Sequence, residues 1–317
     1  MNLEDKKVLV VGLAKTGLAV ARFLKEQGAQ VTATDALSND ELGSYADQAL
    51  SLGVSLELGG HRTRSFVGAD LIVVSPGVPE RISPLKTAVR SGVPVIGEIE
   101  LASRLIREPI AAITGTNGKT TTTSLVGEML KASGQKVYVG GNIGAPLIDY
   151  VHAGMEADVV VAEVSSFQLD TIDHFRPKVG TLLNITEDHL DRYDDFQDYV
   201  QSKGQLFRNQ LETDVAVLNG MDPVVSQLEP FIASQKLYFH VGGAKRELGS
   251  DAIHGVVVEG RELICSLPGQ ERTVFDLSRL KLKGKHNLEN VGAATLTAMF
   301  AGGNRAGIQT ALDQFEG

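Results

Sequence analysis

The first hundred residues alternate short apolar runs with segments of mixed polar and apolar residues. Strands are predicted at residues 8–11, 30–34 and 71–74, with a helix between the first two that ends near Gly28. Strands that alternate with helices form parallel sheets, because each helical crossover covers one face of the sheet. The pattern therefore predicts an α/β fold that begins with a Rossmann-like domain.

A second α/β domain is expected to begin near Pro109, where proline interrupts the preceding helix. Its strands are predicted at 110–113, 137–139, 159–164, 179–185 and 215–218, and its helices near 120–133, 195–209 and 286–301. From 237 to 274, short alternating segments separated by glycine-containing turns indicate a small antiparallel patch. The predicted domains cover residues 1–107 and 108–317.

Turn residues and polar residues follow each of the three strands of the first domain. They are Gly12, Thr16, Asp35, Ser75, Pro76 and Gly77. Ligands of open parallel sheets bind at the carboxyl ends of the strands, where Gly12, Asp35 and Ser75 are expected to meet. Their convergence predicts a binding edge.

The segment Ile-Thr-Gly-Thr-Asn-Gly-Lys-Thr-Thr at 113–121 lies between a predicted strand and a predicted helix. Such a loop directs backbone N–H groups at a phosphate, while a lysine supplies charge and a hydroxyl contacts magnesium. The predicted ATP-binding residues are Gly115, Thr116, Asn117, Gly118, Lys119, Thr120 and Thr121. Ile113 stands where G-x-x-x-x-G-K-[ST] has its first glycine, which disfavours a generic GTPase or kinase. A glycine-rich turn with an incidental lysine is the alternative.

Two candidate metal ligands follow buried strands of the second domain. Glu163 closes an apolar strand, where a carboxylate beside the phosphate loop is placed to hold magnesium together with Thr120. Its alternative role is to cap the following turn. His189 lies in a polar cluster after the next strand, and its place at the same sheet edge favours a ligand over a surface or core histidine.

Three polar residues on predicted helices remain open to two interpretations. Lys203, judged from its helix alone, is a solvated surface charge. Asn287 and Asn290 are three residues apart on one helix face, where they form either a cap and turn or two amides directed at a purine.

Composition narrows the classes of protein. The 317 residues include 30 basic and 39 acidic ones, and no basic block indicates a nucleic-acid surface. No apolar run reaches the roughly 18 residues that a membrane span needs. Cys265 is the single cysteine, which excludes an intrachain disulfide and is expected to be a small core residue rather than a nucleophile. A cytoplasmic enzyme is expected.

Several motifs, in this order, resemble those of the Mur ligases, the ATP-dependent amide-forming enzymes of peptidoglycan precursor synthesis. They are the loop 115–120, Gly-Asn-Ile-Gly at 141–144, Glu-Val-Ser-Ser-Phe-Gln-Leu at 163–169, Asp-His-Leu-Asp-Arg-Tyr at 188–193, Tyr199 with Lys203, and His286-Asn287 with Asn290. The resemblance covers the whole chain. The short first domain looks most like the branch that adds D-glutamate to UDP-N-acetylmuramoyl-L-alanine, although Ala36 stands where a hydrogen-bonding residue can follow the aspartate.

The resemblance implies that the γ-phosphate of ATP is transferred to the substrate carboxylate and that D-glutamate attacks the acyl phosphate. Lys119 would contact the β/γ-phosphates, Thr120 and Glu163 one magnesium ion, and His189 a second, while a carbamylated Lys203 would supply an oxygen donor. Asn287 and Asn290 would approach adenine. The substrate-binding residues would be Thr16, Asp35, Ser75, Pro76, Gly77, Asn142 and Ser165.

The resemblance also implies a monomer with a third, C-terminal domain that binds the amino acid. The chain stops at Gly317 directly after a helix, so we expect that domain to be absent and the chain to bind nucleotides without completing the ligation. Three alternatives are weighed: a folylpolyglutamate synthase, disfavoured by residues 1–107; a nicotinamide-dependent oxidoreductase, disfavoured by Ala14 in place of a second glycine; and a non-catalytic nucleotide-binding module.

Overall fold

The computed structural model describes residues 1–79, 81–188, 192–242, 254–267 and 269–316. The chain forms two compact units. The first contains residues 1–107, 145–155 and 167–175, and the second contains 108–144, 156–166 and 176–317. The segments 145–155 and 167–175, which the sequence assigns to the second domain, thus pack with the first unit. No local sequence pattern reveals this packing.

The first unit is built on a five-stranded parallel sheet of order β3-β2-β1-β4-β5. Its strands are β1 (Lys7–Val11), β2 (Gln30–Thr34), β3 (Ser55–Glu57), β4 (Leu71–Val74) and β5 (Val95–Gly97). In register, Val10 pairs with both Ala33 and Val73. The three predicted strands are confirmed, whereas β3 and β5 have only three residues each and are too short for a periodic pattern to reveal.

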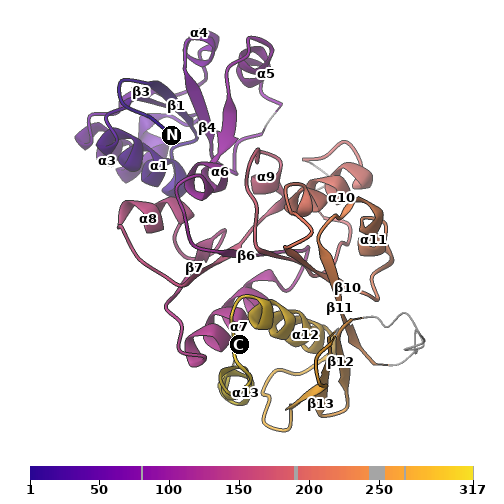
Figure 1. Ribbon diagram of the computed structural model, residues 1–317. Helices are drawn as coiled ribbons and strands as arrows, with labels where there is room; N and C mark the ends of the chain where they lie inside the picture. The colour runs from indigo at the N-terminus through magenta and orange to yellow at the C-terminus, as the bar shows by residue number, and fades with distance from the viewer. Residues whose placement is uncertain (80, 189–191, 243–253, 268, 317) are drawn as a thin grey trace. The chain divides into compact units, whose positions relative to one another are not determined.

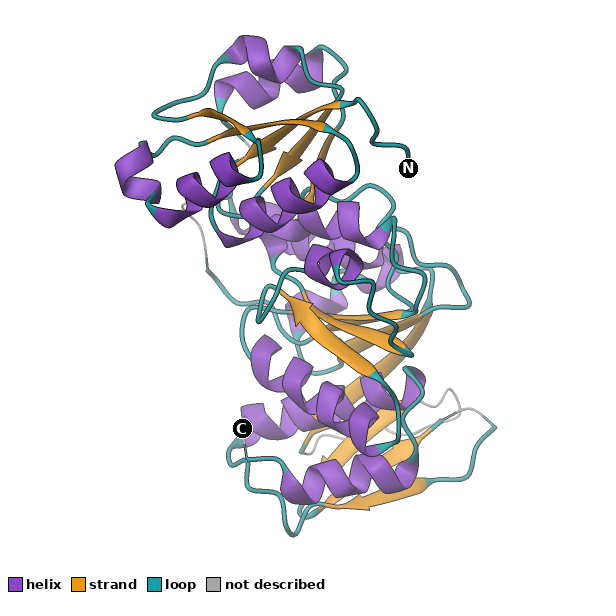
Figure 2. Cartoon of the chain, turned by 90° about the vertical axis from the view of Figure 1, so that its left-hand side faces the viewer, coloured by secondary structure: helices purple, strands orange, loops and turns teal. Residues whose placement is uncertain are grey.

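Helices cover both faces of this sheet, as Figure 2 shows beside the N-terminus. The helices of this unit are α1 (Lys15–Glu26), α2 (Asn39–Leu42), α3 (Ser44–Ser51), α4 (Thr63–Val67), α5 (Ser83–Arg90), α6 (Glu98–Ser103) and α8 (Leu147–His152), together with most of α9 (Ser166–Leu169). On one face, Phe66 of α4 and Leu85 of α5 pack with Leu9 and Ile72 of the sheet. Burial of these apolar side chains is the main stabilising term of the layer.

The second unit contains a nine-stranded sheet of order β14-β13-β12-β11-β10-β9-β6-β8-β7. The strands are β6 (Ile110–Thr114), β7 (Val137–Gly141), β8 (Val159–Glu163), β9 (Val179–Leu182), β10 (Val215–Asn219), β11 (Gln235–Val241), β12 (Gly255–Glu259), β13 (Glu262–Ser266) and β14 (Thr273–Asp276). The antiparallel patch is confirmed for β12, β13 and β14. The prediction of antiparallel pairing is wrong for β11, which pairs in parallel with β10 and β12. Alternating apolar and polar residues indicate burial of one face and not the direction of a strand.

Three long helices pack together in this unit: α7 (Lys119–Ala132), α12 (Lys285–Phe300) and α13 (Arg305–Gln314) (Figure 1). The shorter elements are α10 (Phe196–Gly204), η1 (Gln205–Phe207), α11 (Pro223–Ser226) and η2 (Glu229–Phe231). Residues 290–298 of α12 are all buried, since the helix lies between α7 and strands β9 to β12. Within the described part of the chain, no helix is both long enough and apolar enough to span a membrane.

Candidate functional site

The phosphate loop connects the end of β6 to the start of α7. Gly118 directly precedes the helix with a φ of +85°, a left-handed conformation that L side chains rarely adopt. A Cβ at this position would lie 2.2 Å from Oδ1 of Asn290. Both glycines of the loop are therefore required by their backbone angle and by a close approach: that of α12 at Gly118, and that of Leu183 at Gly115, where φ is +155° and a Cβ would meet Leu183 at 2.9 Å.

Asn184 holds the loop from the neighbouring strand end. Its backbone oxygen accepts from the N–H of Thr116 (3.0 Å), its Oδ1 accepts from the N–H of Asn117 (2.9 Å), and its Nδ2 donates to the Asn117 oxygen (3.0 Å). The sequence analysis did not assign this role. The available signal was a polar residue two positions after β9, at the sheet edge that carries the loop.

Lys119 lies over the loop that it follows. Its Nζ donates to the backbone oxygens of Gly115 (3.0 Å) and Thr116 (2.9 Å). Burial lowers the pKa of the Lys119 ammonium, while the carboxylates of Glu163 and Asp188 oppose that shift. The cation is thus held at the helix N-terminus, where phosphate oxygens bind in loops of this kind.

Glu163, Thr120 and Asn142 form a hydrogen-bonded group at the carboxyl ends of β7 and β8. Thr120 Oγ1 donates to Glu163 Oε2 (2.9 Å), and Asn142 Nδ2 donates to Glu163 Oε1 (2.8 Å). Glu163 is 1% exposed. A buried carboxylate next to a hydroxyl offers the hard oxygen donors that Mg²⁺ prefers, so these residues fit a magnesium ion.

Lys203 is buried and is not a solvated surface charge. It is 2% exposed, its Nζ donates to the Gly115 oxygen (3.0 Å), and it lies 4.6 Å from the centroid of the Tyr199 ring. The sequence alternative of an exposed lysine is therefore wrong, and the structure brings Lys203 to the same carbonyl that Lys119 contacts. His189 lies outside the described residues.

Tyr199 connects α10 to the phosphate loop. Its hydroxyl lies 3.2 Å from Thr116 Oγ1, which also accepts from the N–H of Thr186 (3.1 Å). Burial raises the pKa of Tyr199, so the hydroxyl stays protonated at neutral pH. Tyr199 is a second residue whose placement at the loop the sequence analysis left unassigned.

The two amides of α12 lie on one helix face as predicted. Asn290 Nδ2 lies 3.5 Å from Asn287 Oδ1, and Asn287 Nδ2 donates to the Lys283 oxygen (2.8 Å). Asn290 is buried against Gly118, whereas Thr121 is half-buried in the first turn of α7. The structure thus brings Asn290 to the phosphate loop and leaves both interpretations of the pair possible.

The predicted edge of the first unit forms at the ends of β1, β2 and β4. Asp35 accepts from the N–H of Leu13 through Oδ2 (2.7 Å) and from the N–H of Leu37 through Oδ1 (2.9 Å). Ser75 Oγ donates to the Gly12 oxygen (2.9 Å). These bonds close the turns after all three strands, so Asp35 and Ser75 have a structural task whatever ligand they contact.

The remaining predicted residues flank these groups. Thr16 is half-buried in the first turn of α1, and Pro76 and Gly77 follow Ser75 in the turn after β4. Ser165 is half-buried between β8 and α9 in the second unit. Cys265 is buried beside Met299, and burial raises the pKa of its thiol to about 11, which fits the expected core residue.

Comparison with known proteins decides the family. Residues 113–298 match the Mur ligase middle domain, and residues 6–97 match the N-terminal domain of MurD-like Mur ligases. The chain belongs to the Mur ligase family. It is 51% identical over its whole length to the UDP-N-acetylmuramoylalanine–D-glutamate ligase of Desulfosudis oleivorans, and 48% identical to the ligase of the same name from Geotalea daltonii. In each case it covers 68% of the relative.

Solved structures of other Mur ligases share the fold. A UDP-N-acetylmuramate:L-alanyl-gamma-D-glutamyl-meso-diaminopimelate ligase from Neisseria meningitides superposes with a TM-score of 0.63 at 21% identity, with 99% of each chain covered. A UDP-N-acetylmuramate-alanine ligase from Thermotoga maritima gives a TM-score of 0.55 at 22% identity, and the match covers 98% of this chain and 69% of that one. The predicted α/β fold is confirmed.

The family match also confirms the prediction of an ATP-dependent ligase. A Mur ligase is not a nicotinamide-dependent oxidoreductase, whereas the alternative that this chain binds nucleotides without completing the ligation stays a prediction. The match of residues 6–97 to the N-terminal domain of MurD-like enzymes decides against a folylpolyglutamate synthase. The roles of individual site residues stay predictions.

Proposed function

We propose that the protein acts in the ATP-dependent ligation of D-glutamate to UDP-N-acetylmuramoyl-L-alanine. The observation that carries the proposal is the group of Thr120, Glu163 and Asn142 beside the phosphate loop. It combines an anion-binding helix N-terminus with an oxygen-donor set for a cation, as phosphoryl transfer to a carboxylate requires. The substrates are proposed from the similarity of this whole chain to 68% of each D-glutamate ligase.

The ATP phosphates would bind at the N-terminus of α7, where Lys119 neutralises negative charge on the β/γ-phosphates. Thr120 and Glu163 would hold a magnesium ion, which supplies charge neutralisation to the transferring group. Asn142 keeps the Glu163 carboxylate oriented through its 2.8 Å hydrogen bond. Asn287 and Asn290 would contact adenine, with Asn290 already placed against Gly118.

Lys203 would act in a carbamylated form, with His189 at a second magnesium ion. Addition of CO₂ to the neutral amine releases a proton and replaces a cation with an oxygen donor, which removes charge repulsion toward the metal. The burial of Lys203 beside the phosphate loop, with its Nζ 3.0 Å from the Gly115 oxygen, supports this role because it places the side chain next to the proposed metal site. In an enzyme extended by the amino-acid-binding domain, Lys203→Ala should abolish ligation, and a small carboxylate such as acetate should restore part of it; the absence of any rescue would speak against the carbamate.

Thr16, Asp35, Ser75, Pro76 and Gly77 would contact the UDP-linked substrate at the edge of the first unit. In the second unit, Asn142 is proposed to contact its diphosphate, and Ser165 is a further proposed substrate-binding residue. Asp35 recognises uracil in this proposal through the oxygen lone pairs that the amides of Leu13 and Leu37 do not occupy. We also propose that the enzyme acts in the cytoplasm, where ATP and UDP-linked compounds are made, and that it acts as a monomer.

The test is direct binding measured by titration calorimetry. The protein should bind UDP-N-acetylmuramoyl-L-alanine and ATP with magnesium, and should bind neither NADH nor a folate. Binding of the UDP-linked compound to the Asp35→Asn variant should weaken while ATP binding persists. A protein that bound a folate or NADH more tightly than the UDP-linked compound would refute the proposal.

A further inference from the structure

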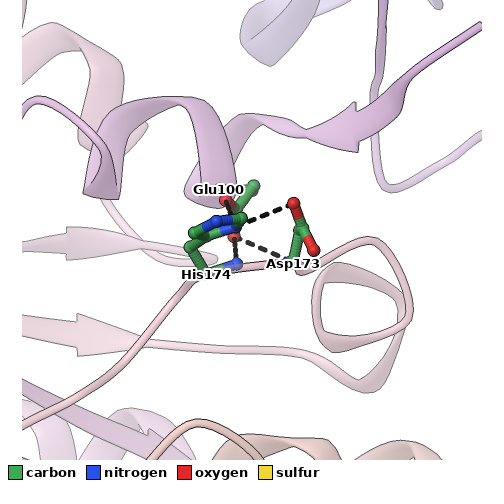
Figure 3. Close-up of side chains that lie close together, drawn as sticks. All are labelled: Glu100, Asp173 and His174. Carbon is green, nitrogen blue, oxygen red and sulfur yellow. Dashed lines mark hydrogen bonds and ion pairs between the residues drawn. The ribbon is translucent and has the colours of Figure 1, made fainter.

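Outside the proposed sites, the side chains of Glu100, Asp173 and His174 lie close together in the first unit (Figure 3). Their ligand atoms are near enough to one another for a metal ion, but hydrogen bonds already satisfy the carboxylate of Glu100. It accepts from the backbone N–H groups of Asp173 (2.9 Å), His174 (3.0 Å) and Phe175 (2.8 Å), and from Arg104 Nε (2.6 Å). This group therefore anchors the chain to α6, and we assign it no ligand.

Two lysines hold the first half of the phosphate loop through its backbone oxygens. The Gly115 oxygen accepts from Lys119 Nζ and from Lys203 Nζ, each at 3.0 Å, and the Thr116 oxygen accepts from Lys119 Nζ at 2.9 Å. In the proposed function, Lys119 donates to the ATP phosphates and Lys203 loses its ammonium group on carbamylation. Neither lysine is then a permanent support of the loop.

Asn184 holds the second half of the loop with a group that the proposed reaction does not change. Its side-chain amide bonds both polar groups of the Asn117 backbone, because Oδ1 accepts from the N–H (2.9 Å) and Nδ2 donates to the oxygen (3.0 Å). Its own backbone oxygen accepts from the N–H of Thr116 (3.0 Å). A primary amide is uncharged and offers a donor and an acceptor at once. Asn184 can therefore keep these bonds before and after ATP binds.

The same bonds determine which amides of the loop can face a phosphate. Asn184 takes up the N–H groups of Thr116 and Asn117, whereas no side chain caps the N-terminus of α7. The N–H groups of a first helical turn have no acceptor within the helix. An anion at the end of α7 is thus left with the amides of residues 118–121.

We infer that Asn184 is a positioning residue for ATP. By fixing the backbone of Asn117, it presents the amides of residues 118–121 to the phosphates, whether or not Lys119 and Lys203 contact the loop. Asn184 acts through the loop and does not touch the reacting groups. The inference rests on the proposed function for the identity of the ligand, while the support of the loop rests on the hydrogen bonds.

The experiment measures ATP affinity by titration calorimetry with magnesium, together with thermal unfolding. Asn184→Ala should weaken ATP binding about tenfold, because it releases both polar groups of the Asn117 backbone. Asn304→Ala is the matched control. Asn304 makes the same pair of bonds at the opposite end of α7, where Oδ1 accepts from the N–H of Gly307 (2.9 Å) and Nδ2 donates to the Ser133 oxygen (3.0 Å). This control should lower the Tm but change ATP affinity by less than about twofold.

Asn184→Asp separates positioning of the loop from stabilisation of the fold. The ionised carboxylate still accepts from the N–H of Asn117, but it cannot donate to the Asn117 oxygen, and it adds negative charge beside the phosphates. ATP should therefore bind more weakly to Asn184→Asp than to Asn184→Ala, and the difference should shrink at high salt, which screens the repulsion. The aspartate variant keeps the side-chain volume, so it remains the test where Asn184→Ala does not fold.

Hydrogen exchange tests the loop bonds without nucleotide. The Asn117 amide should be protected in the wild type and should lose protection in Asn184→Ala. A wild type that bound no ATP would refute the proposed function, and with it the ligand of this inference, even if the Asn117 amide were protected. A wild type that binds ATP, together with Asn184 variants that bind it as tightly or lose no more affinity than Asn304→Ala, would overturn the positioning role.

Discussion

At the scale of single residues, the surroundings of a charged group decide its role more than its place in a motif. Lys119 and Lys203 both donate to the oxygen of Gly115, although their side chains start from different helices. The position of Lys119 follows from the loop motif and was predicted. The burial of Lys203 depends on tertiary packing of α10, which no periodicity within that helix could reveal.

Removal of the Lys119 ammonium should prevent phosphoryl transfer. Lys119→Ala is expected to lower the rate of acyl-phosphate formation by roughly a hundredfold or more, because a positioned cation at the phosphates stabilises developing charge. Positional isotope exchange of the β,γ-bridging oxygen of ATP, which occurs when the acyl phosphate forms reversibly, measures this step. The matched control is Lys131→Ala on the same helix, whose lysine is exposed and pairs with Glu128 (2.9 Å). Equal activities of the two variants would contradict the assignment.

Glu98 should give the protein a pH-dependent stability. Burial raises its pKa from an ordinary value of 4.5 to about 7, with Asp149 adding to the rise and the Ile148 amide opposing it. Between these values the unfolded chain releases the proton and the folded chain keeps it. The contribution of Glu98 to the free energy of unfolding therefore falls as pH rises, by about 1.4 kcal/mol per pH unit.

Glu98→Gln removes this titration. Relative to wild type, the variant should gain roughly 2–3 kcal/mol in free energy of unfolding when the pH is raised from 5 to 8, whatever constant offset the amide introduces. Urea unfolding at four pH values gives the difference. Glu128→Gln, at an exposed position, should show no such trend. A difference that is flat across this range would mean that Glu98 titrates normally.

At the scale of elements, the phosphate loop depends on the close approach of α12 to the N-terminus of α7. Gly118→Ala would place a Cβ 2.2 Å from Asn290 Oδ1 at a φ of +85°. We expect a loss of roughly 1–3 kcal/mol in unfolding free energy, together with weaker ATP binding. Thermal unfolding and ATP titration measure the two effects.

Gly134→Ala is the matched control for this variant. Gly134 has a φ of +89° but open space around its missing Cβ, so it has the backbone strain without the contact. The excess cost of Gly118→Ala is therefore the contact with Asn290, and a second change, Asn290→Ala, should relieve it. Equal costs at the two glycines would show that backbone conformation alone requires Gly118.

The elements themselves were largely predictable where the pattern is strong. The strands that carry Gly12, Asp35 and Glu163 are apolar runs or alternations of four or five residues, and their order along the chain implies a parallel sheet. The direction of β11 was not predictable, since its alternating burial fits a parallel or an antiparallel neighbour. The return of 145–155 and 167–175 to the first unit depends on buried carboxylates of α6, which a sequence presents only as glutamates in a helix.

At the scale of the whole molecule, each unit has its own sheet and its own predicted ligand edge, so binding of the two nucleotides should be separable by mutation. Asp35→Asn keeps the size of the side chain but replaces one oxygen that accepts from the amide of Leu13 or Leu37 with a donor. It should weaken binding of UDP-N-acetylmuramoyl-L-alanine and spare ATP. Lys119→Ala should do the reverse.

Thermal unfolding with each ligand measures this reciprocity. A ligand at a hundred times its Kd stabilises the folded state to which it binds by about 2.7 kcal/mol, so a variant that has lost one site should lose only that ligand's shift. Ser51→Ala is the control and should keep both shifts. Ser51 is exposed at the end of α3, and the contact described for its hydroxyl is the hydrogen bond to the Gln48 oxygen. If Asp35→Asn instead lost part of both shifts to the same extent, the Asp35 carboxylate would stabilise the fold of the first unit rather than bind a ligand. Asp35 lies in the turn that joins β2 to the loop before α2.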